Sequence, residues 1–132
     1  MERILLVDDD ETFLFAGREL LMAQRRALQV DTAGDADTAL QAIRQQDYDV
    51  VVSDIRMPGL DGIQLLIECQ RIRPDIPVVL ISAYEDRELE AEAARLGAYA
   101  FLHKPLDSDT FASVISRAAL RAFIRRNPSA GS

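Results

Sequence analysis

Residues 48–53 read Tyr-Asp-Val-Val-Val-Ser, a short run rich in β-branched side chains that leads directly into Asp54. A second run of the same kind, Ile-Pro-Val-Val-Leu-Ile, occupies residues 76–81. Runs this apolar are typical of strands in a parallel sheet covered on both faces, because neither face of such a strand meets water. These two stretches therefore predict the central strands of an α/β sheet.

Further apolar runs extend the pattern along the chain. We expect strands at 4–7, 28–32, 50–53 and 78–82 and a weaker one at 98–102, with helices near 10–25, 35–46, 62–73, 85–96 and 107–126. Consecutive βα units form right-handed crossovers, which build a sheet with helices on both faces. The pattern predicts a flavodoxin-like doubly wound α/β fold, a five-stranded parallel sheet of order 2-1-3-4-5 with five helices.

Local signals mark several of the helix ends. Asp61 with Gln64, and likewise Asp35, fit the pattern of helix N-caps, and Asp107 or Ser108 would serve the last helix. Gly97 fits a left-handed C-terminal cap after the fourth helix. In the third helix, Ile63, Leu66 and Ile67 have the spacing of core residues, and Cys69 is expected to be buried.

Length and composition limit the range of functions. A chain of 132 residues fits one domain, which we place at 1–126, with 127–132 as a linker or tail. No apolar run approaches the ~20 residues of a membrane span. The net charge of −7 argues against binding nucleic acid. The first residues do not resemble a signal peptide, so we expect a cytoplasmic protein with no membrane contact.

Carboxylates follow two strands that the predicted order makes neighbours. Asp8, Asp9 and Asp10 come after the first strand, and Asp54 comes after the third. A compact cluster of carboxylates is costly without a cation, and hard oxygen ligands suit Mg²⁺. Acidic residues that complement the dipole of a helix start are the alternative, which explains Asp10 well but explains Asp8 and Asp54 poorly.

A hydroxyl and an ammonium follow the last two strands. Ser82 precedes the small Ala83, and Lys104, the only lysine of the chain, precedes Pro105. Both groups can stabilise the oxygens of a phosphoryl group as charge develops on them. Either residue alone is common at a protein surface, so only their shared predicted location at one edge of the sheet points to a phosphoryl-binding role.

Four segments together resemble the motifs of two-component response-regulator receiver domains. They are Val-Asp-Asp-Asp at 7–10, Ser-Asp-Ile-Arg-Met-Pro-Gly-Leu-Asp-Gly at 53–62, Ile-Ser-Ala at 81–83 and His-Lys-Pro at 103–105. The resemblance covers residues 2 to about 124. It implies that Asp54 is the phosphoacceptor. It also implies that Asp9, Asp54 and the backbone carbonyl of Arg56 bind Mg²⁺ directly, and that Asp8 binds it through water.

The same resemblance implies roles for the residues on the side of the site away from the metal. Ser82 and Lys104 would contact the phosphoryl oxygens, with Ala83 and Pro105 supporting them, and the bond between Lys104 and Pro105 would be cis. Phe101 occupies the position of the family's switch aromatic, although a core phenylalanine explains that residue equally well.

Two neighbours of the predicted site lie outside these motif roles. Tyr84 would flank the mouth of the site and modulate the access of water to it. His103, the only histidine, should share a strand face with Phe101 and form a partly buried, hydrogen-bonded ring rather than a phosphohistidine.

The resemblance implies a phosphorelay receiver. It would take a phosphoryl group from the phosphohistidine of a sensor histidine kinase or phosphotransfer protein, and acetyl phosphate should also serve as donor. The chain would catalyse only its own phosphorylation and dephosphorylation, and so would not be an enzyme with an external substrate. Phosphorylation would switch the face made by helix 4, strand 5 and helix 5. The fourth helix suits this movement because Leu89 and Leu96 are its only large apolar residues.

The last helix carries a second apolar feature. Phe111, Ile115, Ala118 and Ala122 form a stripe expected to pack on the sheet, while Leu120 and Ile124 lie on the opposite side, among arginines at 117, 121, 125 and 126. Scattered surface residues are an equally good explanation. We expect a homodimer or contact with an output domain through helices 4 and 5.

Other functions on this architecture are less well supported. A flavodoxin-like mononucleotide binder would hold phosphate on backbone N–H groups after the first strand, where three aspartates would repel it. Hydrolases of the dehalogenase type carry an Asp-x-Asp motif, and Asp-Ile-Arg at 54–56 does not match that motif. The alternative within the family is a degenerate receiver that acts as a phosphorylation-independent scaffold, which usually lacks an acidic, acceptor or lysine position.

Overall fold

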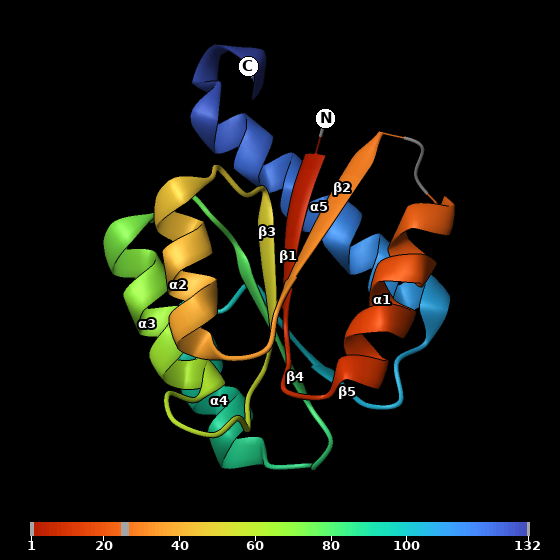
Figure 1. The fold of residues 1–132 in the computed structure, drawn as a ribbon. Coiled ribbons are helices and arrows are strands. Elements are labelled where there is room, and N and C mark those ends of the chain that lie inside the picture. The colour runs from red at the N-terminus through yellow and green to blue at the C-terminus, as the bar shows by residue number, and fades with distance from the viewer. Residues whose placement is uncertain (1, 25–26, 132) are drawn as a thin grey trace.

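The computed structural model describes residues 2–24 and 27–131. Within those residues one parallel sheet has five strands in the order β2-β1-β3-β4-β5, as predicted (Figure 1). The strands are β1 (Glu2–Val7), β2 (Leu28–Ala33), β3 (Val50–Asp54), β4 (Val78–Ser82) and β5 (Ala100–His103). Strand order reverses between β1 and β3, so the site expected in such a sheet lies at their carboxyl ends.

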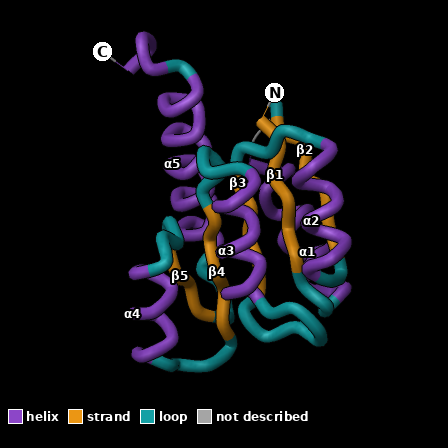
Figure 2. The backbone as a smooth tube through the Cα atoms, turned by 90° about the vertical axis from the view of Figure 1, so that its left-hand side faces the viewer, coloured by secondary structure: helices purple, strands orange, loops and turns teal. Residues whose placement is uncertain are grey.

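Helices cover both faces of this sheet (Figures 1 and 2). They are α1 (Glu11–Gln24), α2 (Ala36–Gln45), α3 (Gly62–Ile72), α4 (Arg87–Arg95) and α5 (Ser108–Arg126), followed by a 3-10 turn, η1 (Pro128–Gly131). Residue 25, predicted to end the first helix, and Ser132 of the predicted tail lie outside the described residues. Within the described part of the chain no helix is both long and apolar enough to cross a bilayer.

The apolar core has two layers, one on each side of the sheet. On one side Leu14 and Leu21 of α1 and Phe111 and Ile115 of α5 pack against the strands. On the other side the buried residues of α2, α3 and α4 form the second cluster. Strands β3 and β4 are buried along nearly their whole length, which explains their unbroken apolar sequence.

Most of the predicted helix ends are confirmed. Asp61 and Gln64 form a reciprocal capping box at the start of α3, and Asp35 caps α2. The cap of α5 is Asp107, whose side chain accepts a hydrogen bond from the Thr110 N–H. Gly97 follows α4 with a φ of 98°, a left-handed conformation that favours glycine.

The inward face of α3 differs from the prediction at one position. Leu66 and Cys69 are buried as expected, and Leu65 joins them, but the side chain of Ile67 is 45% exposed. Leu65 and Ile67 lie two positions apart on the helix, so they cannot both face the sheet. The expectation that Ile67 belongs to the core is therefore wrong. The thiol of Cys69 packs as an apolar group, and burial raises its pKa to about 12.

Helix α4 is the most weakly packed of the helices. Among its nine described residues only Ala93 is fully buried. Leu89 and Leu96, the two large apolar residues of the predicted helix, are partly buried against the apolar cluster that includes α2 and α3. The burial of so little apolar area holds a helix weakly.

Candidate metal and phosphoryl site

The carboxyl ends of β1 and β3 bring the predicted acidic residues together. Val7 is paired with Ser53 in the sheet, so the next residue of each strand, Asp8 and Asp54, lies at the same edge. Carboxylate oxygens of Asp8, Asp9 and Asp54 lie within 4.8 Å of one another. Asp8 is buried, with 1% of its side chain exposed, whereas Asp9 lies at the surface.

The donor set of this cluster fits Mg²⁺. All three side chains offer hard oxygen ligands, and the exposed position of Asp9 leaves space on the solvent side for water ligands, several of which Mg²⁺ normally keeps. Asp10 lies outside the cluster. Its carboxylate accepts hydrogen bonds from the backbone N–H groups of Thr12 and Phe13 and thereby caps α1, which supports the helix-start explanation for that residue.

Lys104 reaches the acidic cluster from the end of β5. Its Nζ atom donates a hydrogen bond to Asp8 Oδ2 at 2.8 Å and lies 3.7 Å from Asp54 Oδ2. The backbone N–H of Lys104 donates to the carbonyl of Ser82, which continues the pairing of β4 with β5 by one residue and fixes the backbone of Lys104. The peptide bond from Lys104 to Pro105 is cis, as the resemblance implied.

The charges of the site shift the pKa values of its groups. Burial raises the pKa of Asp54, the charge of Asp8 raises it further, and Lys104 with the backbone N–H groups of Arg56 and Ile55 offsets only part of this rise. Burial alone would lower the pKa of Lys104, but the hydrogen bond to Asp8 and the charge of Asp54 outweigh it, so that pKa lies above its ordinary value. The site has an excess of negative charge, and a bound cation would offset it.

Ser82 is buried beside the acceptor strand. Asp54 is paired in the sheet with Ile81, so Ser82 is one residue beyond that pair. The Ser82 hydroxyl donates to the carbonyl of Tyr84 and accepts from the Tyr84 N–H, at 3.0 and 3.1 Å. The hydroxyl would have to exchange these local hydrogen bonds for a contact with a phosphoryl oxygen. Ala83, between the two residues, is exposed.

Phe101 and His103 share one face of β5, as predicted. Their ring centroids are 5.4 Å apart, and Phe101 is partly buried against the core. The expected burial of His103 is wrong, because its side chain is 40% exposed. Its Nε2 atom lies 3.9 Å from a carboxylate oxygen of Glu90 on α4. Strand β5 is an edge strand, and the weakly packed α4 leaves this position open to water.

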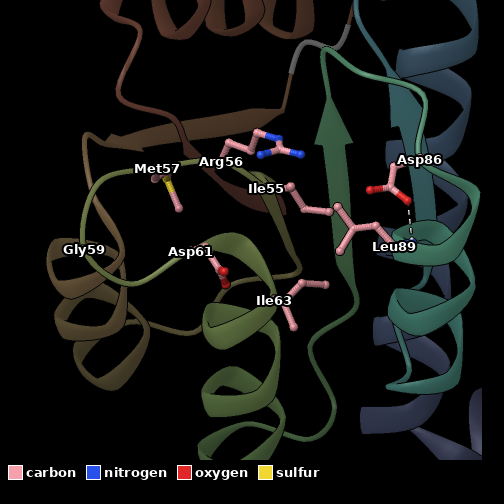
Figure 3. A pocket seen from close by; sticks show the side chains of 8 residues that line it. All are labelled: Ile55, Arg56, Met57, Gly59, Asp61, Ile63, Asp86 and Leu89. Atoms are coloured by element: carbon pink, nitrogen blue, oxygen red, sulfur yellow. Dashed lines mark hydrogen bonds between the residues drawn. The ribbon is translucent and has the colours of Figure 1, made fainter.

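A cavity of about 600 Å³ separates the loop after β3 from the start of α4 (Figure 3). Ile55, Arg56 and Met57 line it from the loop, and Asp86 and Leu89 line it from the other side. Figure 3 shows the Asp86 carboxylate accepting the hydrogen bond that caps α4. The first turn of α4 therefore borders open space on the side that faces the loop after β3.

Two contacts at the site have no counterpart in the sequence argument. The guanidinium of Arg56 lies over the ring of Tyr84, 5.2 Å from its centroid, so these two side chains form a cation–π pair. The Lys104 ammonium lies over the ring of Phe13, 4.3 Å from its centroid. An aromatic residue in the first turn of α1 is the only signal that the sequence offers for the second contact.

Comparison with known proteins identifies close relatives of this arrangement. The family model described as response regulator receiver domain matches residues 4–116. The C4-dicarboxylate transport transcriptional regulatory protein DctD of Pseudomonas aeruginosa is 42% identical over 118 residues, which cover 88% of this chain and 25% of that protein. The chain spans about a quarter of the length of the curated relatives it matches.

Solved structures have the same fold. A response regulator receiver domain protein from Clostridium thermocellum superposes with a TM-score of 0.87 at 28% identity, covering 94% of this chain and 98% of that one. The solution structure of the beryllofluoride-activated NtrC4 receiver domain dimer superposes with a TM-score of 0.86 at 29% identity, covering 92% of this chain and 99% of that one.

Proposed function

The chain belongs to the response regulator receiver domain family, and from that membership we propose that it accepts a phosphoryl group on Asp54 in a Mg²⁺-dependent reaction. The donor is the phosphohistidine of a sensor histidine kinase or a phosphotransfer protein. One observation carries the proposal. The carboxylate of Asp54 lies within 4.8 Å of those of Asp8 and Asp9 and 3.7 Å from the ammonium of Lys104, at the carboxyl ends of the strands.

The chemistry follows from this arrangement. A carboxylate oxygen of Asp54 forms the bond to phosphorus while the phosphorus–nitrogen bond of the donor breaks. The bonding pair stays on that nitrogen, and because the other ring nitrogen of the donor carries a proton, the histidine leaves as a neutral imidazole. Asp9, Asp54 and the backbone carbonyl of Arg56 would hold Mg²⁺ directly and Asp8 would hold it through water. The bound ion would offset the repulsion between Asp54 and the incoming phosphoryl group. Lys104 is near enough to contact an oxygen of the transferred group.

The output is a shift in the conformation of α4, β5 and α5. When the phosphoryl group draws Ser82 and Lys104 towards it, the Ser82–Tyr84 hydrogen bonds break and the ring of Phe101 moves inward. Helix α4 follows, because its burial is slight and the cavity at its first turn gives it room. We also infer that the chain catalyses only its own phosphorylation and dephosphorylation and acts on no external substrate.

We expect partner proteins to bind the exposed face of α5. Leu120, Phe123 and Ile124 of α5 are exposed, between 41% and 58%. Of the arginines expected around them, Arg126 instead turns towards the start of β3 and the loop before β4. The NtrC4 receiver is a dimer in its activated form, and DctD is a transcriptional regulatory protein. We propose that this face of α5 contacts a second copy of the chain or an output domain.

The test is the modification itself. Incubation with acetyl phosphate and Mg²⁺ should add one phosphoryl group to the wild-type protein, seen as an intact-mass increase, and chelation of the metal should prevent it. The Asp54→Asn protein should stay unmodified. Equal modification of both proteins would refute the acceptor assignment. A wild-type protein that binds Mg²⁺ but is never modified would favour the alternative of a phosphorylation-independent scaffold.

A further inference from the structure

Lys104 has an aromatic neighbour that the chemistry above does not use. The Phe13 ring lies against its ammonium, with the centroid 4.3 Å from Nζ. The same Nζ atom lies 2.8 Å from a carboxylate oxygen of Asp8 and 3.7 Å from one of Asp54. A lysine side chain has four flexible carbons, so its charge stays in one place only where contacts outweigh the lost side-chain entropy.

The ring of Phe13 is itself held from two directions. Asp10 accepts hydrogen bonds from the backbone N–H groups of Thr12 and Phe13, which fixes the first turn of α1. The ring is partly buried and packs against the apolar cluster that α1 and α5 form with the sheet. Phe13 and Lys104 also line a cavity of about 260 Å³ together with Pro105.

We propose that Phe13 is a positioning residue for Lys104. The face of its ring keeps the ammonium at the border of the acidic cluster, next to the acceptor carboxylate. A cation is attracted to the negative face of an aromatic ring, so this contact adds a third attraction to those of the two carboxylates. Without the ring, the ammonium spends more of its time in rotamers directed away from Asp54. This inference rests on the proposed function, because it gives Lys104 a role at the transferred phosphoryl group.

The expected consequence is slower phosphoryl transfer with the metal site unchanged. A preorganised charge lowers the barrier more than one that must first be ordered. From the usual strength of such contacts, Phe13→Leu should slow the modification of Asp54 by acetyl phosphate about two- to fivefold at saturating Mg²⁺. A ring-fluorinated phenylalanine at position 13 keeps the shape but weakens the negative face, and it should slow the reaction in the same direction.

The chain allows a direct spectroscopic test, because Lys104 is its only lysine and isotopically labelled lysine gives one set of side-chain signals. The ring current of Phe13 should shift the ε protons of Lys104 upfield in the unmodified wild-type protein, and Phe13→Leu should remove that shift. Phe15→Leu is the matched control, since Phe15 lies on the same helix with 70% of its side chain exposed. It should change neither the shift nor the rate.

The outcomes test the role of Phe13 separately from the proposed function. Loss of the upfield shift in Phe13→Leu, together with slower modification of both the leucine and the fluorinated proteins, supports the role of Phe13. An unshifted lysine signal in the wild type, or equal rates in the wild type and both Phe13 variants, overturns it. The lysine signal is read before any phosphorylation. If the wild-type protein is not modified at all, the proposed function fails, whatever the position of the lysine signal.

Discussion

Lys104 connects the phosphoryl site to β5 through a single side chain. Its ammonium lies 2.8 Å from a carboxylate oxygen of Asp8 and 3.7 Å from one of Asp54. A contact to a phosphoryl group on Asp54 would pull on the end of β5, from which the change reaches α4. We therefore propose that Lys104 reports the modification of Asp54 to strand β5.

We predict that Lys104→Ala leaves Asp54 open to modification but uncouples it from α4. Mg²⁺ should be present throughout, because the buried Asp8 loses its protein cation in this variant. Amide spectra of both proteins, with and without beryllofluoride, measure the response. The wild type should show shifts across residues 83–104, and the variant should show them only close to Asp54. The same shifts in both proteins would contradict this role.

Single residues were predictable where strand ends determine their position. Asp8 and Asp54 directly follow apolar strands, so the strand order alone places them together. Contacts made by long or aromatic side chains were not predictable in this way. The stacking of Phe13 on Lys104 depends on the angle at which α1 packs, and the exposure of His103 depends on how little α4 covers β5.

At the scale of elements, the turn from β3 into α3 requires a glycine at position 62. A Cβ atom there would lie 2.5 Å from the backbone oxygen of Asp54 and 2.8 Å from the Cα atom of Ile55. The Gly62 N–H also donates to the Ile55 carbonyl at 2.9 Å. The start of α3 is therefore packed directly against the backbone that carries the acceptor.

We predict that Gly62→Ala destabilises the fold by about 1–3 kcal/mol, because backbone atoms must move to admit the methyl group. It should also weaken Mg²⁺ binding, since the displaced backbone carries Asp54. Gly34→Ala is the control, because a Cβ atom at Gly34 meets nothing within 4 Å. Urea unfolding and titration calorimetry measure the two effects. Equal stability of the two variants would show that the loop has more room than the structure indicates.

Arg126 anchors the C-terminal end of α5, which lies at the amino ends of the strands, away from the acidic site (Figure 1). Its guanidinium donates to Asp75, to the backbone carbonyl of Tyr48 and, at 3.0 Å, to Asp49. Burial works to raise the pKa of Asp75, but the hydrogen bond and charge of Arg126 outweigh it and hold that pKa below its ordinary value. The ion pair with Arg126 therefore stabilises the charged form of Asp75.

We predict that Arg126→Met lowers the free energy of unfolding by about 1–3 kcal/mol at neutral pH. A carboxyl group with a lowered folded-state pKa contributes stability above its unfolded pKa and loses it as the pH falls through the folded value. The difference between wild type and variant should therefore shrink on acidification below the ordinary pKa of aspartate. Arg125→Met, at an exposed neighbour, is the control. A difference that grows on acidification would contradict this sign.

The elements themselves were largely predictable, since their ends depend on local residues such as Asp61, Asp107 and Gly97. Which residues of a helix face the core was less predictable. Ile67 has helical core spacing, yet it is exposed because the sheet lies under Leu65 and Leu66 instead. Helical spacing defines a broad stripe, and only the packing angle decides which border of the stripe faces the core.

For the whole molecule, we predict that the exposed apolar face of α5 mediates self-association on activation. Sedimentation of the wild type with Mg²⁺ and beryllofluoride should show a dimer, and the Leu120→Glu, Ile124→Glu double variant should stay monomeric because charges are costly in an apolar interface. Both side chains are exposed, so the fold should tolerate the changes. A wild type that is monomeric under all conditions would rule out self-association through this face.

The architecture was predictable as a whole because few sheet topologies satisfy right-handed crossovers and buried central strands. The observed order of β2-β1-β3-β4-β5 is the one expected. The cavity between the loop after β3 and α4 was not predictable, because it depends on how loosely two elements pack rather than on any residue pattern. That loose packing is the property on which the proposed switch depends.

The most direct test of phosphorylation at Asp54 is to locate the modified residue. Borohydride reduces an acyl phosphate, but not a free carboxylate, to an alcohol, so an aspartyl phosphate is recovered as homoserine. Trypsin separates Asp54, in residues 45–56, from Asp8 and Asp9, in residues 4–18. After treatment with acetyl phosphate and Mg²⁺, the proposal predicts homoserine at position 54. Homoserine at position 8 or 9, or at no position in a protein that binds Mg²⁺, would contradict it.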